Sequence, residues 1–214
     1  HEIRNPLTVL KMLYHSLGLE FPKNDPRTED VRIMGEKMDH LNNIVEQILT
    51  FARNAEPQFK PSDVNKIIND LRILVRRKFA QQKVVLNTQL AENLPEAKAD
   101  EQQLSQVFLN LTLNALEAMP NGGELKIKSS STQLQKNKNK VTNIQIEFSD
   151  TGSGMNSELR KKAFTSLLNS SKPGGTGIGL AIVNRIIESH GGEIKIRPNV
   201  KGTTFSVYIP IFHN

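Results

Sequence analysis

The chain has 214 residues, of which 37% are hydrophobic and 23% charged, and its formal net charge is +6. These proportions exclude a disordered chain and allow one large domain or two modest ones. The absence of cysteine excludes disulfides and thiolate metal sites, and no apolar run reaches the ~18 residues that a membrane-spanning helix needs. The basic residues are scattered and aromatic residues are few, so nucleic-acid binding is disfavoured.

Residues 1–54 carry the apolar periodicity of two α-helices. In the first helix the apolar positions recur every three or four residues, at Ile3, Leu7, Leu10, Tyr14 and Leu17, and a similar series runs through residues 31–52. Residues 21–26 contain two prolines and read as the turn between the helices. Stripes this narrow bury little surface in one hairpin, so we predict a homodimer in which two hairpins form a four-helix bundle. The alternative is a hairpin packed on the rest of its own chain.

Residues 55–61 contain two prolines and read as a linker to a second region, residues 62–214. In this region we predict helices at 62–82, 101–119, 157–164 and 177–190, and strands at 84–90, 124–132, 143–149, 193–197 and 203–209. Either Ser62 or Asp63 can cap the first of these helices. A polar loop of lysine and asparagine is expected between the second and third strands. The elements define an α+β fold with a mixed or antiparallel sheet and helices on one face.

The helix expected at 101–119 carries Asn110 and Asn114 four residues apart, and therefore on one face. Asparagine is a mediocre helix former because its side chain competes for backbone hydrogen bonds, so two of them at mid-helix suggest a polar role. An amide oxygen suits Mg²⁺, which keeps several waters and takes other oxygens from phosphates. The alternative is a partly buried amide pair that satisfies local backbone groups. Leu109, Leu113 and Leu116 are expected to pack on the sheet.

Two glycine-rich segments follow this helix. Asp150-Thr-Gly-Ser-Gly-Met comes directly after a predicted strand, where an aspartate can accept a hydrogen bond from an exocyclic amine such as that of adenine. The glycines let the backbone approach a ring closely. The segment 174–180 runs into the next helix, whose first N–H groups and positive dipole end can meet phosphates. Each motif is weak alone, and the context excludes a Rossmann site or a P-loop.

In this order, the motifs resemble the sequence boxes of sensor histidine kinases. The matching segments are His1-Glu-Ile-Arg-Asn-Pro-Leu (H box), Asn110-Leu-Thr-Leu-Asn114-Ala-Leu-Glu-Ala (N box), Asp150-Thr-Gly-Ser-Gly-Met (G1 box), Gly175-Thr-Gly-Ile-Gly-Leu-Ala-Ile-Val (G2 box), and Gly202-Thr-Thr-Phe with Ile209-Pro in the final strand. The resemblance covers essentially the whole chain. It implies a dimerisation and histidine-phosphotransfer hairpin over residues 1–54, and a Bergerat-type ATP-binding α/β sandwich with a mixed sheet over residues 62–214.

The resemblance also implies the activity. ATP would phosphorylate His1, and the phosphoryl group would pass to an aspartate of a response-regulator receiver domain. Glu2 would accept a hydrogen bond from the His1 ring, Asn5 would orient water for a phosphatase activity on the regulator, and Asn114 would bind Mg²⁺. The nucleotide-binding residues would be Asn110, Asn114, Asp150, Gly152, Gly154, Met155, Lys172, Gly175, Thr176, Gly177, Gly179, Leu180 and Thr203.

One substitution argues against a stand-alone ATPase, and one departure in the lid keeps a non-enzymatic function open. Asn110 stands where chaperone and DNA-repair ATPases of the same superfamily carry a water-activating glutamate, and an amide cannot be a general base, so slow intrinsic hydrolysis is expected. The lid segment 164–172, which ends at Lys172, lacks the proline common in the family and is one residue longer. The alternatives are a nucleotide-sensing dimer scaffold and a stand-alone ATPase.

Three further expectations concern Pro6, the other histidines and the context of the chain. Pro6 removes a helical hydrogen bond near His1 and predicts a hinge there. His15, His40, His190 and His213 are expected to be ordinary surface or interface residues. Because the chain opens at the acceptor histidine, we expect an upstream segment to be missing. The catalytic portion is expected to be cytoplasmic, with any membrane contact confined to that missing segment.

Overall fold

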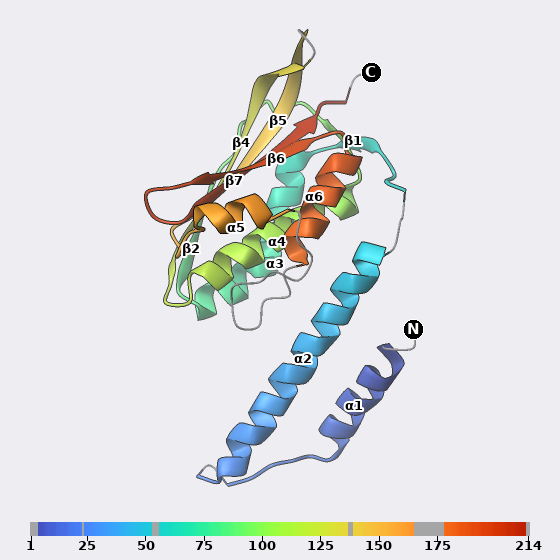
Figure 1. The fold of residues 1–214 in the computed structure, drawn as a ribbon, viewed down its shortest axis with the longest axis vertical. Helices are drawn as coiled ribbons and strands as arrows, with labels where there is room; N and C mark the ends of the chain where they lie inside the picture. Colours follow the sequence, from blue (N-terminus) through green and yellow to red (C-terminus); the bar gives the residue numbers. More distant parts are fainter. Residues whose placement is uncertain (1–3, 23, 53–55, 137–138, 165–177, 213–214) are drawn as a thin grey trace. The chain divides into compact units, whose positions relative to one another are not determined.

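The structure is a computed structural model that describes residues 4–22, 24–52, 56–136, 139–164 and 178–212. The described residues fall into two compact units, one made by the N-terminal helices and the other by residues 56–164 and 179–212 (Figure 1). Within this described part, no helix combines the length and apolarity that crossing a lipid bilayer requires.

The first unit is a helical hairpin formed by α1 (Arg4–Ser16) and α2 (Pro26–Ala52). The Tyr14 hydroxyl donates a hydrogen bond to the backbone oxygen of Val31 at 2.6 Å, and Lys11 Nζ lies 2.7 Å from Asp39 Oδ1. Gly35 makes room for the Tyr14 ring, because a Cβ at this glycine would lie 2.8 Å from the hydroxyl oxygen. These contacts run in opposite directions along the two helices, so the predicted antiparallel hairpin is confirmed.

The second unit contains a five-stranded sheet in the order β2-β4-β5-β7-β6. Its strands are β2 (Val84–Gln89), β4 (Gly123–Lys136), β5 (Asn139–Asp150), β6 (Glu193–Pro198) and β7 (Thr203–Pro210). β2 runs parallel to β4, whereas the other neighbours are antiparallel, so the sheet is mixed. A separate two-stranded sheet pairs β1 (Lys60–Ser62) with β3 (Ala97–Ala99).

Three helices of this unit cover one face of the sheet (Figure 1). They are α3 (Val64–Gln81), α4 (Glu101–Ala118) and α6 (Gly179–Ser189), while α5 (Ser157–Lys162) is a short additional helix. Asp63 caps α3 by accepting from the Lys66 N–H, and Asp100 caps α4 in the same way. The core between helices and sheet is fully buried, as at Phe108 of α4 and Phe148 of β5. The predicted α/β sandwich with a mixed sheet and helices on one face is confirmed.

The structure differs from the sequence-based elements at three places. β4 and β5 continue to Lys136 and Asn139, through most of what was expected to be a polar loop. Lys60 and Pro61, expected in the linker, belong to β1 and pair antiparallel with β3. The helix expected from residue 177 is described from Gly179 onward, and residue 177 lies outside the described residues.

Candidate functional site

The amide pair of α4 is the first part of the site. Asn110 and Asn114 are half-buried, and the Nδ2 atom of each is buried without a hydrogen-bond partner. A buried donor without a partner is unfavourable, so these two donors do not satisfy local backbone groups and could serve a ligand. A 180° rotation of an amide exchanges its nitrogen for its oxygen, so each position can offer either a donor or a hard oxygen ligand.

The second part is the carboxylate of Asp150, at the end of β5. Asp150 is 3% exposed, and its Oδ1 accepts hydrogen bonds from the backbone N–H of Gly152 at 2.8 Å and of Thr203 at 3.3 Å. Gly202 permits this packing, because a Cβ at that position would lie 2.6 Å from Oδ1. The surrounding backbone therefore fixes the direction of this buried acceptor inside the domain.

The loop after Asp150 rests on the C-terminal end of α4. The Ser153 N–H donates to the Ala118 carbonyl at 3.1 Å, and a Cβ on Gly152 would lie 2.6 Å from the same oxygen. Gly154 has a φ of +71°, which favours glycine. Because Asn114 precedes Ala118 by about one helical turn, the fold brings the amide face of α4 and the Asp150 loop together.

The start of α6 supplies two further predicted residues. Gly179 and Leu180 form its first turn, and α6 packs against α4. Among the residues that the structure describes, none has an atom within 4 Å of a Cβ built on Gly179. Met155, half-buried, is held through its carbonyl by Arg160, whose guanidinium donates at 2.6 Å.

Several predicted residues cannot be placed in this site. His1 and Glu2 lie outside the described residues, as do Lys172, Gly175, Thr176 and Gly177. Asn5 is an exposed residue in the first turn of α1, and Pro6 follows it in the same turn. The bend predicted at Pro6 depends on the placement of residues 1–3, so the hinge stays a prediction.

His190 was predicted to be an ordinary surface or interface residue, but it is buried within the second unit. It is 5% exposed, and its Nε2 accepts a hydrogen bond from the Asp100 backbone N–H at 3.1 Å. Its Nδ1 lies 2.8 Å from the Ile186 carbonyl, so Nδ1 carries the proton and donates. Burial lowers the pKa of His190, although the Ile186 carbonyl and Asp100 act in the opposite direction.

Asp100 makes hydrogen bonds both with His190 and with Gln58, which lies near the start of the second unit. Its Oδ2 accepts from the Gln58 backbone N–H at 3.0 Å, while Oδ1 caps α4. Burial alone would raise the pKa of Asp100, but the N–H donors of Gln58 and of the first turn of α4 lower it overall. Phe59 meets the His190 ring edge-on at 5.2 Å between centroids. No local sequence pattern indicates this cluster, because His190 lies 90 positions from Asp100.

The mixed sheet covered by three helices, the amide face of α4 and the buried carboxylate at the end of β5 together define an ATPase-like α/β sandwich. Residues 99–213 match the family described as histidine kinase-, DNA gyrase B-, and HSP90-like ATPase, and the chain belongs to this family. Residues 1–57 match the His Kinase A (phospho-acceptor) domain. The resemblance seen in the sequence motifs is therefore confirmed.

Similar proteins are sensor kinases. Sensor histidine kinase ZraS of Escherichia coli is 31% identical over 212 residues, which cover 99% of this chain and 44% of ZraS. Sporulation kinase C of Bacillus subtilis is 30% identical over 217 residues, covering 99% of this chain and 47% of that protein. The chain therefore spans less than half the length of these relatives.

Solved structures show the same fold. Full-length ShkA in complex with AMPPNP has a TM-score of 0.77 at 22% identity, covering 100% of this chain and 45% of that one. Histidine kinase ThkA in complex with the response regulator protein TrrA has a TM-score of 0.74 at 25% identity, covering 99% of this chain and 59% of that one.

Proposed function

We propose that this chain is the catalytic core of a protein-histidine kinase, in which ATP phosphorylates His1 and the phosphoryl group then passes to an aspartate of a response-regulator receiver domain. The observation that carries the proposal is that two amides with unpartnered nitrogen atoms lie on α4, whose C-terminal end supports the loop of a fixed carboxylate. The phospho-acceptor match over residues 1–57 supports His1 as the acceptor. The complex of ThkA with TrrA supports the class of partner.

ATP would bind across the end of α4. Asp150 would accept a hydrogen bond from the adenine amino group, with Gly152, Gly154, Met155 and Thr203 lining the ring. The first N–H groups of α6, at Gly179 and Leu180, would face the phosphates. The remaining proposed contacts, which lie outside the described residues, are Lys172, Gly175, Thr176 and Gly177.

The amide face of α4 fits a chelated triphosphate. Asn110 and Asn114 offer buried groups that lack a protein partner, and an amide oxygen at Asn114 is a suitable hard ligand for Mg²⁺. Bound Mg²⁺ would neutralise charge on the triphosphate. Asn110 would donate to a phosphate oxygen. Neither amide can deprotonate water, so hydrolysis without His1 should be slow.

The acceptor chemistry belongs to His1. Its unprotonated ring nitrogen would form a bond to the γ-phosphorus while the bond from that phosphorus to the bridging oxygen breaks and ADP leaves. Glu2 would accept the N–H of the other ring nitrogen and so raise the nucleophilicity of the first. Asn5, exposed in the first turn of α1, would orient water for a separate activity, the dephosphorylation of the regulator.

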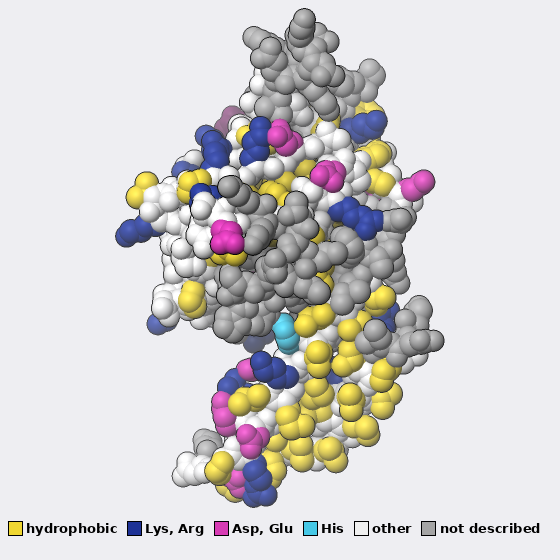
Figure 2. Space-filling model, in the orientation of Figure 1, with side chains coloured by type: hydrophobic (Ala, Val, Ile, Leu, Met, Phe, Trp, Pro, Cys, Tyr) yellow, Lys and Arg dark blue, Asp and Glu magenta, His cyan; other side chains and the backbone are white. Residues whose placement is uncertain are grey.

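The hairpin would act as a homodimer. Its two helices leave a group of apolar side chains between 39% and 68% exposed, at Val9, Leu10, Met12, Leu13, Leu17, Ile33, Met34 and Leu41. Figure 2 shows this apolar surface over the hairpin. Apolar patches of this kind mark interaction sites, and a second hairpin packed as a four-helix bundle would cover it.

ATP labelled at the γ-phosphate tests the kinase. We expect the label on the wild type, at an acid-labile site that mass spectrometry locates on His1, and none on His1→Gln. His15→Gln, at an exposed histidine of α1, should keep the label. Nucleotide binding without any label would favour the scaffold, and phosphate release that survives His1→Gln would favour the ATPase.

A further inference from the structure

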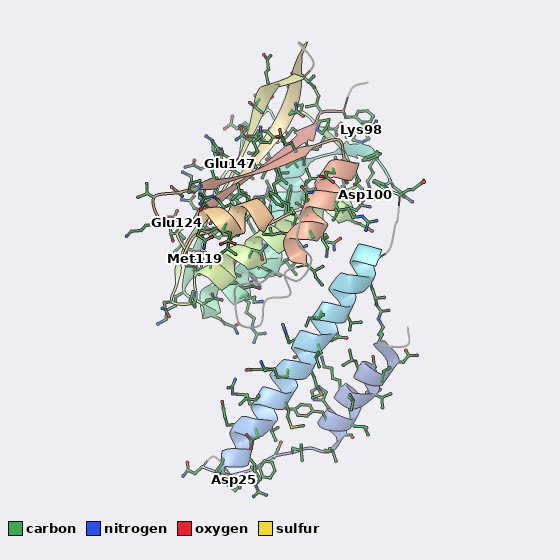
Figure 3. All side chains as sticks on the ribbon, in the orientation of Figure 1. Asp25, Lys98, Asp100, Met119, Glu124 and Glu147 are labelled. Carbon is green, nitrogen blue, oxygen red and sulfur yellow. The ribbon has the colours of Figure 1, made fainter. Side chains whose placement is uncertain are left out.

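The C-terminal end of α4 accepts hydrogen bonds both from the Asp150 loop and from the turn after α3. A helix leaves its last carbonyl groups without intrahelical partners, so other groups must satisfy them. Ala118 receives the Ser153 N–H of the Asp150 loop at 3.1 Å. Asp100 and Met119 mark the two ends of this helix in Figure 3, with Glu124 close to the Met119 end.

The Gln82 side chain, from the turn after α3, holds this helix end. Its Nε2 donates to the Leu116 carbonyl at 2.6 Å and to the Met119 carbonyl at 3.0 Å. Each carbonyl also accepts one backbone N–H, from Met119 at 2.9 Å and from Gly122 at 3.1 Å respectively. One amide group therefore joins the last turn of α4 to the residue that terminates it.

Gln82 is itself fixed by the turn in which it lies. Its backbone N–H donates to the Lys78 carbonyl at 3.1 Å as the C-cap of α3. Lys83 follows with a φ of +56°, and a Cβ on Gly122 would lie 2.7 Å from the Lys83 carbonyl oxygen. The turn after α3 thus packs directly on the turn after α4, and Val84 then pairs with Gly123 in the sheet.

The Asp150 loop is built on these same groups. The Thr151 N–H donates to the Glu124 carbonyl at 3.1 Å, and the Thr151 hydroxyl accepts from the Glu124 N–H at 3.0 Å. Thr151 Oγ1 also lies 3.6 Å from the Met119 sulfur. A shift of the Leu116–Met119 end would therefore move the loop that orients the Asp150 carboxylate.

We propose that Gln82 is a positioning residue for adenine recognition, acting through the end of α4 on the direction of the Asp150 carboxylate. The inference rests on the proposed function, in which Asp150 accepts from the adenine amino group. Gln82 makes its contacts on α4, not on the carboxylate, so its effect is indirect.

Three variants isolate the side-chain amide. Gln82→Met keeps the length but removes the donor, so the Leu116 and Met119 carbonyls lose their shared partner. Gln82→Lys restores a donor that is also favourable beside a helix C-terminus. Gln81→Met is the matched control, because Gln81 is exposed at the end of the same helix.

Calorimetry with ATP and with inosine triphosphate, which has no amino group on the ring, measures the effect on the whole chain. Each variant is first melted, and binding is measured well below its melting temperature. We expect the Gln82→Met dissociation constant for ATP to rise about fivefold, roughly the effect of one hydrogen bond, while that for inosine triphosphate stays constant. In Gln82→Met the ratio of the inosine triphosphate dissociation constant to that of ATP should therefore fall about fivefold. The same ratio in Gln82→Lys and in Gln81→Met should equal that of the wild type.

The outcomes separate the inference from the function on which it rests. A lower melting temperature for Gln82→Met with an unchanged preference for ATP would show that Gln82 is only structural, and would overturn the inference. An equal loss for both nucleotides would also overturn it, since a misdirected carboxylate must affect the amino group selectively. A wild type that binds neither nucleotide would overturn the proposed function itself.

Discussion

The hydrogen bonds that hold the Asp150 side chain come from two backbone N–H groups and do not require a charged acceptor. An asparagine at this position keeps an oxygen that can accept from Gly152 and Thr203, so the loop should stay folded. We predict that Asp150→Asn weakens ATP binding roughly ten- to hundredfold, the range expected for loss of a hydrogen bond to a charged group. Calorimetry measures the change, with the melting temperature as the control for folding. Unchanged affinity would remove Asp150 from the nucleotide site.

Thr112 offers a prediction about stability alone. Its side chain is fully buried in α4, and its hydroxyl lacks a hydrogen-bond partner. Thr112→Val replaces that hydroxyl with a methyl group of similar size, and the two residues have similar helix propensities. We expect about 1 kcal/mol of added stability, a rise of about 2–4 °C in melting temperature. Thr112→Ser, which keeps the hydroxyl and loses the methyl group, should melt below the wild type. A Thr112→Val protein that melts lower would contradict the prediction.

At the residue scale, the sequence identified the polar groups better than their surroundings. The spacing of Asn110 and Asn114 was enough to place both on one helix face, because helix geometry is local. The burial of Thr112 and His190 could not be read in the same way, because it depends on neighbours that are distant in sequence. His190 shows this most clearly, since one of its hydrogen-bond partners is the distant Asp100.

At the scale of elements, the sequence predicted the bounds of the helices more accurately than it predicted which face of α4 is buried. Leu109 and Leu113, expected to pack on the sheet, are only half-buried, whereas Leu104, Phe108 and Leu111 are fully buried. α4 contacts α3 and α6 on its flanks as well as the sheet, so several of its faces are covered. Local periodicity cannot rank these faces, since it does not contain the neighbouring helices.

The short and polar strands were missed for a different reason. β1 has three residues and includes Pro61, so its sequence carries little strand preference. The distal part of β4 is mainly polar, and only its pairing with β5 identifies it as a strand. Backbone pairing of this kind leaves no alternation of apolar and polar residues in the sequence.

The packing of α6 against the start of α4 makes stability depend on pH. The His190 ring faces the Asp100 N–H, the Ile186 carbonyl, the Ser189 hydroxyl and the Phe59 ring, and burial lowers its pKa. The unfolded chain therefore binds this proton more tightly than the folded one, so stability is full above histidine's ordinary pKa of about 6.5 and is lost as the pH falls below it.

His190→Gln should remove this dependence. We expect the wild-type melting temperature to fall between about pH 7.5 and 5.5, and the fall to be smaller in the variant. His15→Gln, at an exposed histidine in the hairpin, should retain the wild-type slope. Equal slopes in the wild type and in His190→Gln would show that another group carries the pH dependence.

At the scale of the whole molecule, the order of the motifs predicted the function class, but not the order of the strands. The parallel pairing of β2 with β4 places the turn after α3 beside the turn after α4. That neighbourhood joins Gln82 to the end of α4 and thereby to the Asp150 loop. No local sequence pattern around Gln82 predicts these hydrogen bonds, because the two acceptor carbonyls lie 34 and 37 positions later in the chain.

The apolar surface of the hairpin carries the last prediction, on assembly. Leu13 of α1 is 53% exposed, and in a symmetric bundle its counterpart on the second copy would be buried as well. Leu13→Glu would remove about 1.5 kcal/mol of apolar burial from each copy and would place a carboxylate at the interface. Two copies lose about 3 kcal/mol, so the dissociation constant of the dimer should rise roughly hundredfold.

Light scattering coupled to gel filtration measures this change as a fall from twice the mass of one chain to a single mass. Leu74→Glu is the matched control, because Leu74 of α3 is 69% exposed in the second unit and lies outside the hairpin. The control should keep the wild-type mass, since a charge at an already solvated position disturbs no apolar contact. If Leu13→Glu and the wild type elute with the same mass, the apolar surface of the hairpin has another occupant than a second copy of this chain.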